Sequence, residues 1–293
     1  MEVRRTPDDR FAGLPDWTFA PRYVEVEGLR LARVDEGAGD PVVLLHGEPT
    51  WSFLYRRVVP PLVGAGLRVV APDLVGFGRS DKPDDPGWYT YDRHVDLLTR
   101  HLAALDLARV TLVVQDWGGP IGLRWAMAHP DLVARIVILD TGLFSGREAS
   151  AGLDAWLAYA RAQTDLDVGA LLDRACGGLP PEVVAGYDAP FPDVTFKAGA
   201  LAFPRLVPTR MDDPGAAEQL ATREALDAWD GPVQVAFADA DPIFPAAVGE
   251  AWTRRLRHAD PFLLIEGAGH FVQEMRPDAV AAAILGHVGR HPF

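Results

Sequence analysis

The chain has 293 residues, of which 48% are hydrophobic and 24% charged, a balance typical of a globular protein with a large buried core. Its 41 acidic and 28 basic residues give a net charge of −13, which disfavours nucleic acid and anionic membranes as partners. Cys176 is the only cysteine, which excludes an intramolecular disulfide and a thiolate metal site. No run approaches the ~18 apolar residues of a membrane-spanning helix, and residues 1–17 lack the apolar stretch of a signal peptide. We therefore expect a cytoplasmic protein.

Short runs of apolar and β-branched residues recur along the chain and predict strands. Two strands are expected within residues 23–35, joined by a turn at Glu27-Gly28, and a third at 41–45. Further strands are predicted at 67–71, 110–114, 133–139, 233–237 and 262–265, with helices at 91–105, 118–129 and 277–288. Strands that alternate with helices predict an α/β fold with a mostly parallel eight-stranded sheet, covered by helices on both faces.

The alternation of strands and helices stops between about residues 143 and 211. This stretch contains no strand-like run, and proline and glycine cluster at 177–181 and 189–192. We therefore expect residues 143–211 to form an inserted helical cap domain. Residues 1–142 and 212–293 would then form one core domain.

The strand predicted at 110–114 runs directly into the sequence QDWGG at 115–119, and a helical pattern follows at once. This strand-turn-helix context is typical of a nucleophile elbow, and Asp116 occupies the position where hydrolases often carry Ser. Gly118 and Gly119 allow the close packing that so sharp a turn requires. The alternative is that Asp116 only caps the helix, since Asp is a good N-cap residue.

A carboxylate nucleophile restricts the chemistry that the site can perform. A serine that attacked saturated carbon would form an ether, which offers no carbonyl group for water to attack. An alkylated Asp116 is an ester, which water can hydrolyse. The sequence therefore favours displacement at saturated carbon or the opening of an epoxide.

The best candidate for the general base is His270, which lies in a glycine-rich turn, GAGHF at 267–271, after the last predicted strand. His46 precedes a glycine at a strand end and is interpreted as structural. The remaining histidines lie in polar or helical contexts and are expected at the surface: His94, His101, His129, His258, His287 and His291.

An imidazole that activates water needs a carboxylate to fix its tautomer and to stabilise the imidazolium. Asp241, in the sequence FADADP at 237–242, follows the penultimate strand and is our first choice. Asp140, which ends the strand at 133–139, is the second. Asp239, closer to its strand end than Asp241, is the third.

Three motifs resemble haloalkane dehalogenases: HGEPTWS at 46–52, DLVGFGRSDKP at 73–83 and VQDWGG at 114–119. Within that family they are similar to the subfamily whose catalytic acid is Asp. The segment YDAPFPD at 187–193, followed by KAG at 197–199 and FP at 203–204, resembles the cap domain of the family. The resemblance extends over about residues 5–270 and implies the α/β-hydrolase fold.

The resemblance implies a role for each catalytic residue. Asp116 would displace halide from a haloalkane and form an alkyl ester, and His270, oriented by Asp241, would activate the water that hydrolyses it to a primary alcohol. The backbone N–H groups of Glu48 and Trp117 would form the oxyanion hole. The indole N–H of Trp117 would bind the halide, because a group that only donates suits an anion. The resemblance implies no cofactor and no metal; substrate, water and halide would be the partners of a monomer or weak homodimer.

A second halide donor is expected from a tryptophan of the cap. Some family members carry it about a dozen residues before the YDAPFPD motif, where this chain has Ala175. Trp156 is the only tryptophan of the cap segment and is our candidate, although it could instead pack a helix together with Leu153 and Leu157. A small dry pocket between core and cap is also expected. Its predicted apolar lining is Pro120, Phe144, Phe203, Pro204, Val207, Ile243 and Phe244.

Three competing functions remain open. An epoxide hydrolase could use the same Asp-His-Asp residues with Tyr159 and Tyr187 of the cap as proton donors. A fluoroacetate-type dehalogenase would need an arginine just after the nucleophile, and residues 117–121 contain none. A ligand-binding protein without activity is also conceivable, because fold does not imply function. Such a protein would be expected to have lost at least one catalytic residue.

Overall fold

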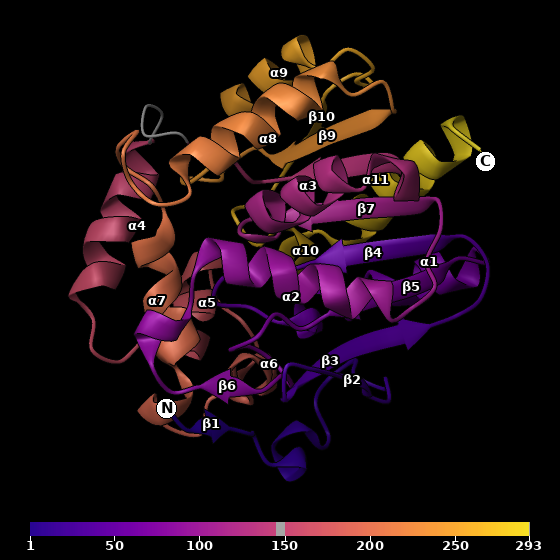
Figure 1. Cartoon of the computed structure of the whole chain (residues 1–293). Coiled ribbons are helices and arrows are strands. Elements are labelled where there is room, and N and C mark those ends of the chain that lie inside the picture. The colour runs from indigo at the N-terminus through magenta and orange to yellow at the C-terminus, as the bar shows by residue number, and fades with distance from the viewer. Residues whose placement is uncertain (145–149, 293) are drawn as a thin grey trace.

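The computed structural model describes residues 1–144 and 150–292 and has an eight-stranded sheet at its centre (Figure 1). The strand order is β10-β9-β8-β7-β4-β5-β3-β2, with parallel pairing from β10 to β5 and antiparallel pairing of β3 and β2. These strands are β2 (Arg22–Val26), β3 (Leu29–Glu36), β4 (Pro41–Leu45), β5 (Arg68–Pro72), β7 (Val110–Gln115), β8 (Val133–Leu139), β9 (Val233–Ala238) and β10 (Leu263–Ile265). The predicted fold class is confirmed.

Each predicted strand is present, and its ends lie within a few residues of the expected ones. The sequence missed the small antiparallel pair β1 (Val3–Arg4) and β6 (Lys82–Pro83), since two residues are too few to show a periodicity. It also left several helices unassigned. The helices of the core are α1 (Val59–Gly64), α2 (Tyr91–Ala103), α3 (Gly118–Ala128), α8 (Ala216–Ala228), α9 (Ala246–Arg255), α10 (Val272–Met275) and α11 (Pro277–Arg290).

The central strands read as continuous apolar runs because helices cover both faces of the sheet. In β7 all six residues are buried. Leu112 faces the hydrophobic cluster that contains Ile121 of α3, whereas its neighbour Val113 faces the opposite cluster with Ile284 of α11. Burial of each such aliphatic side chain stabilises the folded protein by about 1.5–3 kcal/mol relative to leaving it exposed. The apolar packing on both faces of the sheet holds the carboxyl ends of the strands, and the loops that follow them, in fixed positions.

The chain between β8 and β9 contains no strand among its described residues. Its helices are α4 (Ala151–Ala162), α5 (Val168–Ala175), α6 (Pro181–Asp188), the short 3-10 helix Val194–Phe196, α7 (Ala198–Leu206) and α8. Helix α4 packs on α7 and α5 on α6, at the left of the sheet in Figure 1, whereas α8 packs on α3 of the core. In the part of the chain that the structure covers, no helix has the length and apolarity needed to cross a membrane.

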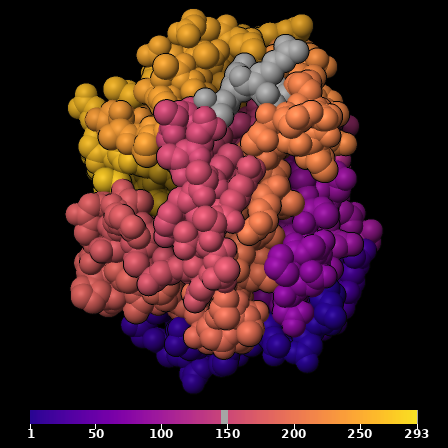
Figure 2. Space-filling view, turned by 90° about the vertical axis from the view of Figure 1, so that its left-hand side faces the viewer, coloured from indigo at the N-terminus to yellow at the C-terminus, as the bar shows by residue number. Residues whose placement is uncertain are grey.

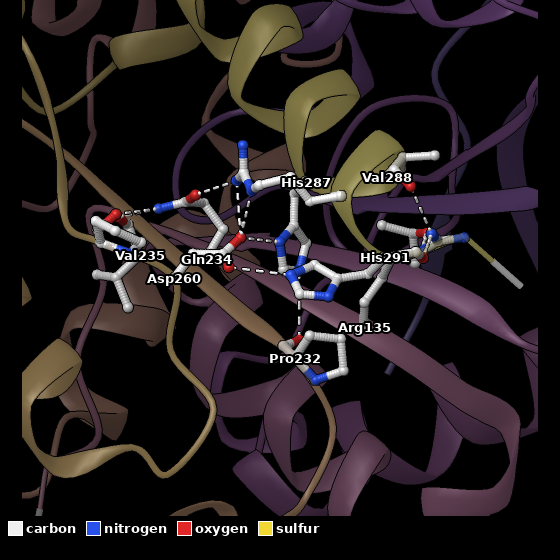
Figure 3. A network of polar contacts seen from close by, with 11 residues as sticks. Arg135, Pro232, Gln234, Val235, Asp260, His287, Val288 and His291 are labelled. Carbon is white, nitrogen blue, oxygen red and sulfur yellow. Dashed lines mark hydrogen bonds and ion pairs between the residues drawn. The ribbon is translucent and has the colours of Figure 1, made fainter.

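Helix α11 is fixed to the sheet by a polar network around the carboxylate of Asp260 (Figure 3). His287 Nδ1 lies 2.7 Å from Asp260 Oδ2, and His291 Nε2 lies 3.0 Å from Asp260 Oδ1. The guanidinium of Arg290 donates to Oδ2 at 2.7 and 2.9 Å. Burial alone would raise the pKa of Asp260, but the hydrogen bonds from His291, His287 and Arg290 lower it to about 2.

This network gives the first prediction, which concerns stability. Asp260→Asn is expected to lower the free energy of unfolding at pH 7 by about 2 kcal/mol, because the folded protein favours the charged carboxylate. This contribution is present above the unfolded-state pKa of about 4 and is lost as the pH falls toward 2. Urea titrations of both proteins from pH 7 downward measure it. Asp212→Asn, which breaks an exposed ion pair with Arg210, is the control and should change stability by less than about 0.5 kcal/mol.

The expected surface position of three histidines is wrong. His94, His101 and His287 are buried, because the helices α2 and α11 turn these positions toward the core. His129 and His291 are half-buried and His258 is exposed. His46 is buried, with Nδ1 2.8 Å from Gly47 O and Nε2 accepting from the backbone N–H of Leu74. Its structural interpretation is consistent with these bonds.

Candidate active site

Asp116 lies in the turn between β7 and α3 with a φ of 48°. This left-handed conformation is unusual for a residue with a Cβ and is retained where surrounding contacts enforce it. The N–H of Asp116 donates to Asp140 O at 3.1 Å, and its carbonyl accepts from Gly119 N at 2.8 Å and from Thr141 Oγ1 at 2.6 Å. The turn therefore presents the carboxylate outward from the carboxyl edge of the sheet.

Two glycines make room for this turn. A Cβ on Gly118 would lie 2.4 Å from the carbonyl oxygen of Leu45 in β4. A Cβ on Gly47 would lie 2.1 Å from Asp116 Oδ1. Real Cβ atoms do not come this close, so Gly118 lets the turn approach the backbone of β4, and Gly47 leaves room for the side chain of Asp116.

The structure brings Asp116, His270 and Asp241 together from three different loops. His270 Nδ1 lies 2.9 Å from Asp241 Oδ2, and His270 Nε2 lies 3.5 Å from Asp116 Oδ2. The backbone N–H of Glu48 donates to Asp116 Oδ1 at 2.8 Å. Asp239 is separate: it is exposed, and its Oδ1 accepts from the N–H of Ala268 at 3.1 Å.

Gln115, which the sequence analysis did not select, also holds the histidine. Its side-chain amide donates to His270 O at 3.1 Å and lies 3.3 Å from His270 Nε2. It is wholly buried next to the nucleophile. A polar residue at the last position of a buried strand is the signal that could have identified it.

The charges around His270 favour its protonated form in the free protein. Burial alone would lower the pKa of His270, but the charge of Asp241 and hydrogen bonds to Asp116 and Asp241 raise it well above its usual value. Burial would raise the pKa of Asp241, yet His270 and the backbone N–H groups of Ile243 and Phe244 lower it. The neighbouring groups therefore favour the protonated form of His270.

The surroundings of Glu48 favour its neutral form, in contrast to those of Asp241, which favour the carboxylate. Its burial and the nearby charge of Asp116 raise its pKa well above the usual value. Its Oε1 is buried and has no hydrogen-bond partner among the described residues. Burial and the nearby Asp116 thus favour the neutral form of the Glu48 side chain.

A cavity of about 500 Å³ opens above Asp116 and His270, between the core, the helices α4 and α5, and Val207 at the end of α7. Figure 2 shows the molecule from the side of these helices. The lining is Glu48, Pro49, Asp116, Trp117, Pro120, Phe144, Leu153, Trp156, Tyr159, Leu171, Arg174, Ala175, Val207, Ala240, Pro242, Ile243, Phe244, Gly269, His270 and Phe271. Most of these side chains are apolar, so the cavity suits a small uncharged ligand.

Two residues predicted to line the pocket, Phe203 and Pro204, are not part of the lining formed by the described residues. Helix α7 turns Phe203 away from the cavity, so that its ring packs against Phe77 at 5.0 Å and against Trp117 at 5.2 Å. Phe203 therefore supports Trp117 from behind. The other five predicted residues do line the cavity: Pro120, Phe144, Val207, Ile243 and Phe244.

Both tryptophans considered as halide donors line the cavity, and so does Ala175. Trp117 is buried, and Trp156 of α4 is half-buried with its ring 6.0 Å from that of Tyr159. Leu153 lines the cavity from the same face of α4, three residues before Trp156. The helical spacing of these two positions is the signal that could have added Leu153 to the predicted pocket lining.

The two tyrosines required by an epoxide hydrolase do not meet in this cavity. Tyr159 lines it, but Tyr187 is wholly buried elsewhere and donates its hydroxyl to Glu274 Oε2 at 2.6 Å. Arg56 pairs with the same oxygen at 2.6 Å. Tyr187 is thus part of a structural ion-pair network. Among the described residues, the site therefore lacks the pair of tyrosine proton donors that an epoxide hydrolase would use.

Comparisons with known proteins show the family of this chain. Residues 40–277 match the model of the alpha/beta hydrolase fold family. The haloalkane dehalogenase of Mycobacterium marinum is 44% identical, over 97% of this chain and 99% of that protein, and haloalkane dehalogenase 1 of Mycobacterium tuberculosis is 48% identical, over 97% and 98%. The solved structure of the haloalkane dehalogenase DpaA from Paraglaciecola agarilytica is 33% identical, with a TM-score of 0.93 over 100% of both chains. This chain belongs to the α/β-hydrolase fold family and, within it, to the haloalkane dehalogenases.

Proposed function

We propose that this enzyme hydrolyses small apolar haloalkanes to a primary alcohol and a halide ion, through a covalent alkyl ester on Asp116. The observation that carries the proposal is the carboxylate of Asp116 at the base of an apolar cavity, 3.5 Å from an imidazole that is itself paired with Asp241. No cofactor takes part in this reaction.

In the first half-reaction a carboxylate oxygen of Asp116 attacks the carbon that carries the halogen. The new C–O bond forms as the carbon–halogen bond breaks, and the halide leaves with the bonding electrons. The negative charge thus moves from Asp116 to the halide. The indole N–H groups of Trp117 and Trp156, both in the cavity lining, are the proposed donors to this anion.

Alkylation prepares His270 for the second half-reaction. Asp116 is one of the groups that raise the pKa of His270, and its charge disappears when it becomes an ester. The imidazolium is then less stabilised, so His270 releases its proton to solvent and becomes a base. Asp241 keeps the remaining proton on Nδ1 and leaves Nε2 free to accept one.

In the second half-reaction His270 Nε2 takes a proton from water while the water oxygen attacks the carboxyl carbon of the ester. The backbone N–H of Glu48, already 2.8 Å from Asp116 Oδ1, and that of Trp117 are the proposed oxyanion hole. The bond between the carboxyl carbon and the alkoxy oxygen then breaks, and the alcohol leaves with the proton. Asp116 is regenerated with one oxygen from water, and the second proton of that water passes from its carboxyl group to His270.

Halide release measured with a pH indicator tests the function. We expect acid production from short bromoalkanes. Hydrolysis of styrene oxide releases no acid and is followed by chromatography of its diol, and we expect no diol because Tyr187, which donates its hydroxyl to Glu274, is not available to protonate an alkoxide. Turnover of styrene oxide at a rate similar to that of 1-bromobutane would instead support the epoxide hydrolase.

Gly47 provides a prediction about the positioning of the nucleophile. Gly47→Ala is expected to lower kcat by about 100-fold, because the new Cβ displaces Asp116 from its place beside His270. Gly64→Ala is the matched control, since the structure shows no described atom within 4 Å of a Cβ at that position. Steady-state kinetics with 1,2-dibromoethane, together with melting curves, measure both. Equal activity of the two variants would contradict the prediction.

The helices beyond β8 are proposed to act as a cap domain over residues 143–211, with residues 1–142 and 212–293 as the core. The contribution of Leu153, Trp156, Leu171 and Arg174 to the cavity lining supports this division. Residues 145–149 of the proposed cap lie outside the described residues.

The proposed assembly is a monomer or weak homodimer in the cytoplasm. The described chain exposes few large apolar residues, which supports weak association. The Paraglaciecola agarilytica structure is described as tetrameric. Light scattering, measured as the protein elutes from a size-exclusion column, distinguishes the monomer, the dimer and the tetramer. Fractionation of cells that express the protein tests the proposed cytoplasmic location.

A further inference from the structure

Asp140 follows β8, the strand that lies between β7 of the nucleophile and β9 of the catalytic acid. It is wholly buried and has a positive φ of 23°. Its backbone carbonyl accepts the N–H of Asp116 at 3.1 Å, and its Oδ1 accepts the N–H of Ala238 at 2.9 Å. A buried carboxyl group thus lies directly behind the catalytic residues, and the proposed reaction leaves it without a role.

The side chain of Asp140 meets the carboxyl group of Asp241. The second oxygen of Asp140, Oδ2, is buried and receives no donor from the described residues, yet the carboxyl of Asp241 lies within hydrogen-bonding reach of the side chain. Two carboxylates in contact inside a protein cannot both be ionised, so they share one proton. A proton held between the two carboxyl groups would supply the hydrogen bond that Asp140 Oδ2 lacks.

The surroundings of the two carboxyl groups decide which of them holds the proton. Asp241 accepts from Ile243 N at 2.7 Å and faces His270 at 2.9 Å, so its negative charge is well supported. Asp140 accepts one backbone N–H, that of Ala238, and none of its described hydrogen bonds comes from a cation. Burial and the charge of Asp241 raise the pKa of Asp140 well above its usual value.

We propose that Asp140 is a positioning residue that stays protonated at neutral pH and donates a hydrogen bond to Asp241. This inference rests on the proposed roles of Asp241 and His270. A donor on Asp241 withdraws part of the negative charge that faces His270, so the imidazolium is less stabilised. The charged groups that act on this pair are His270, which faces Asp241, and Asp116, which acts through His270. With Asp116 alkylated, Asp140 makes it easier for His270 to become neutral and to serve as the base.

Infrared spectra test the protonation state without any turnover. In protein labelled with ¹³C at its aspartate side chains, Glu48 stays unlabelled, so an isotope-shifted carbonyl band of a protonated acid at pH 7 reports aspartic acid alone. We expect this band in the wild type and its loss in Asp140→Asn. A wild type without the band, or a variant that keeps it, would overturn the inference.

The pH profile of ester hydrolysis, measured in single turnovers, tests the effect on His270. Asp140→Asn can still accept from the N–H of Ala238 and donate to Asp241, and its side chain is neutral like the proposed protonated Asp140. The apparent pKa of the acid limb should therefore match that of the wild type. Asp140→Ala removes the donor, so the limb should move to higher pH by about one unit. If Asp140 were instead ionised, Asp140→Asn would remove a negative charge and the limb would move to lower pH.

The first half-reaction separates this inference from the proposed function. Both variants should still release a burst of halide, because Asp116 is intact, and the burst also shows that they are folded. A wild type that releases no halide would refute the proposed function. Normal halide release with an acid limb that moves in Asp140→Asn would refute only the role of Asp140.

Discussion

His270→Phe is expected to separate the two half-reactions: the enzyme still becomes alkylated but no longer turns over. The carboxylate of Asp116 needs no base to attack carbon, and its contact with the N–H of Glu48 does not involve His270. Hydrolysis of the ester does need a base, and such a role is typically worth about 10² to 10⁴ in rate. The variant should therefore accumulate a stable alkyl ester.

Mass spectrometry and bromide release measure this result. With 1-bromobutane, the variant should release about one equivalent of bromide per active site and gain the mass of one butyl group, and a tryptic peptide should carry that mass on Asp116. The exposed His258 supplies the control, since His258→Phe should turn over normally. Continuous turnover by His270→Phe at the wild-type rate, or an adduct on another residue, would refute this division of labour.

Asp116→Asn is expected to abolish both halide release and adduct formation. The amide has nearly the same shape as the carboxylate, so the turn and the cavity are preserved while the nucleophile is lost. Removal of an enzymatic nucleophile can cost about 10⁶-fold in kcat. The exposed Asp131 supplies a charge-matched control, because Asp131→Asn also removes one negative charge but lies outside the cavity lining.

Intact mass after mixing with 1,2-dibromoethane, together with the rate of bromide release, distinguishes the two variants. The protein must be freshly purified, since deamidation would regenerate Asp116. Undiminished activity of an undeamidated Asp116→Asn sample would exclude Asp116 as the nucleophile. A large loss in Asp131→Asn would show instead that the net charge of the protein controls the reaction.

The sequence alone determined the features that depend on neighbouring residues. Alternating apolar runs and helical patterns predicted all eight strands of the sheet, because strands buried on both faces need a continuous apolar sequence. The QDWGG turn identified Asp116 as a nucleophile candidate, because a strand, a sharp glycine-rich turn and a helix follow one another within a few residues. His270 was found in the same way, from its glycine-rich turn after the last strand.

Only the tertiary structure decided which side chains meet. Asp140, Asp239 and Asp241 all follow strands, but only Asp241 lies against Nδ1 of His270, 29 residues further along the chain. This contact depends on the order of neighbouring strands and on the loops that follow them, which no local pattern records. The same reason explains why Phe203 packs behind Trp117 rather than lining the cavity. A helical pattern gives the spacing of side chains on α7, whereas the packing of the helix against the core determines which of its faces meets the substrate.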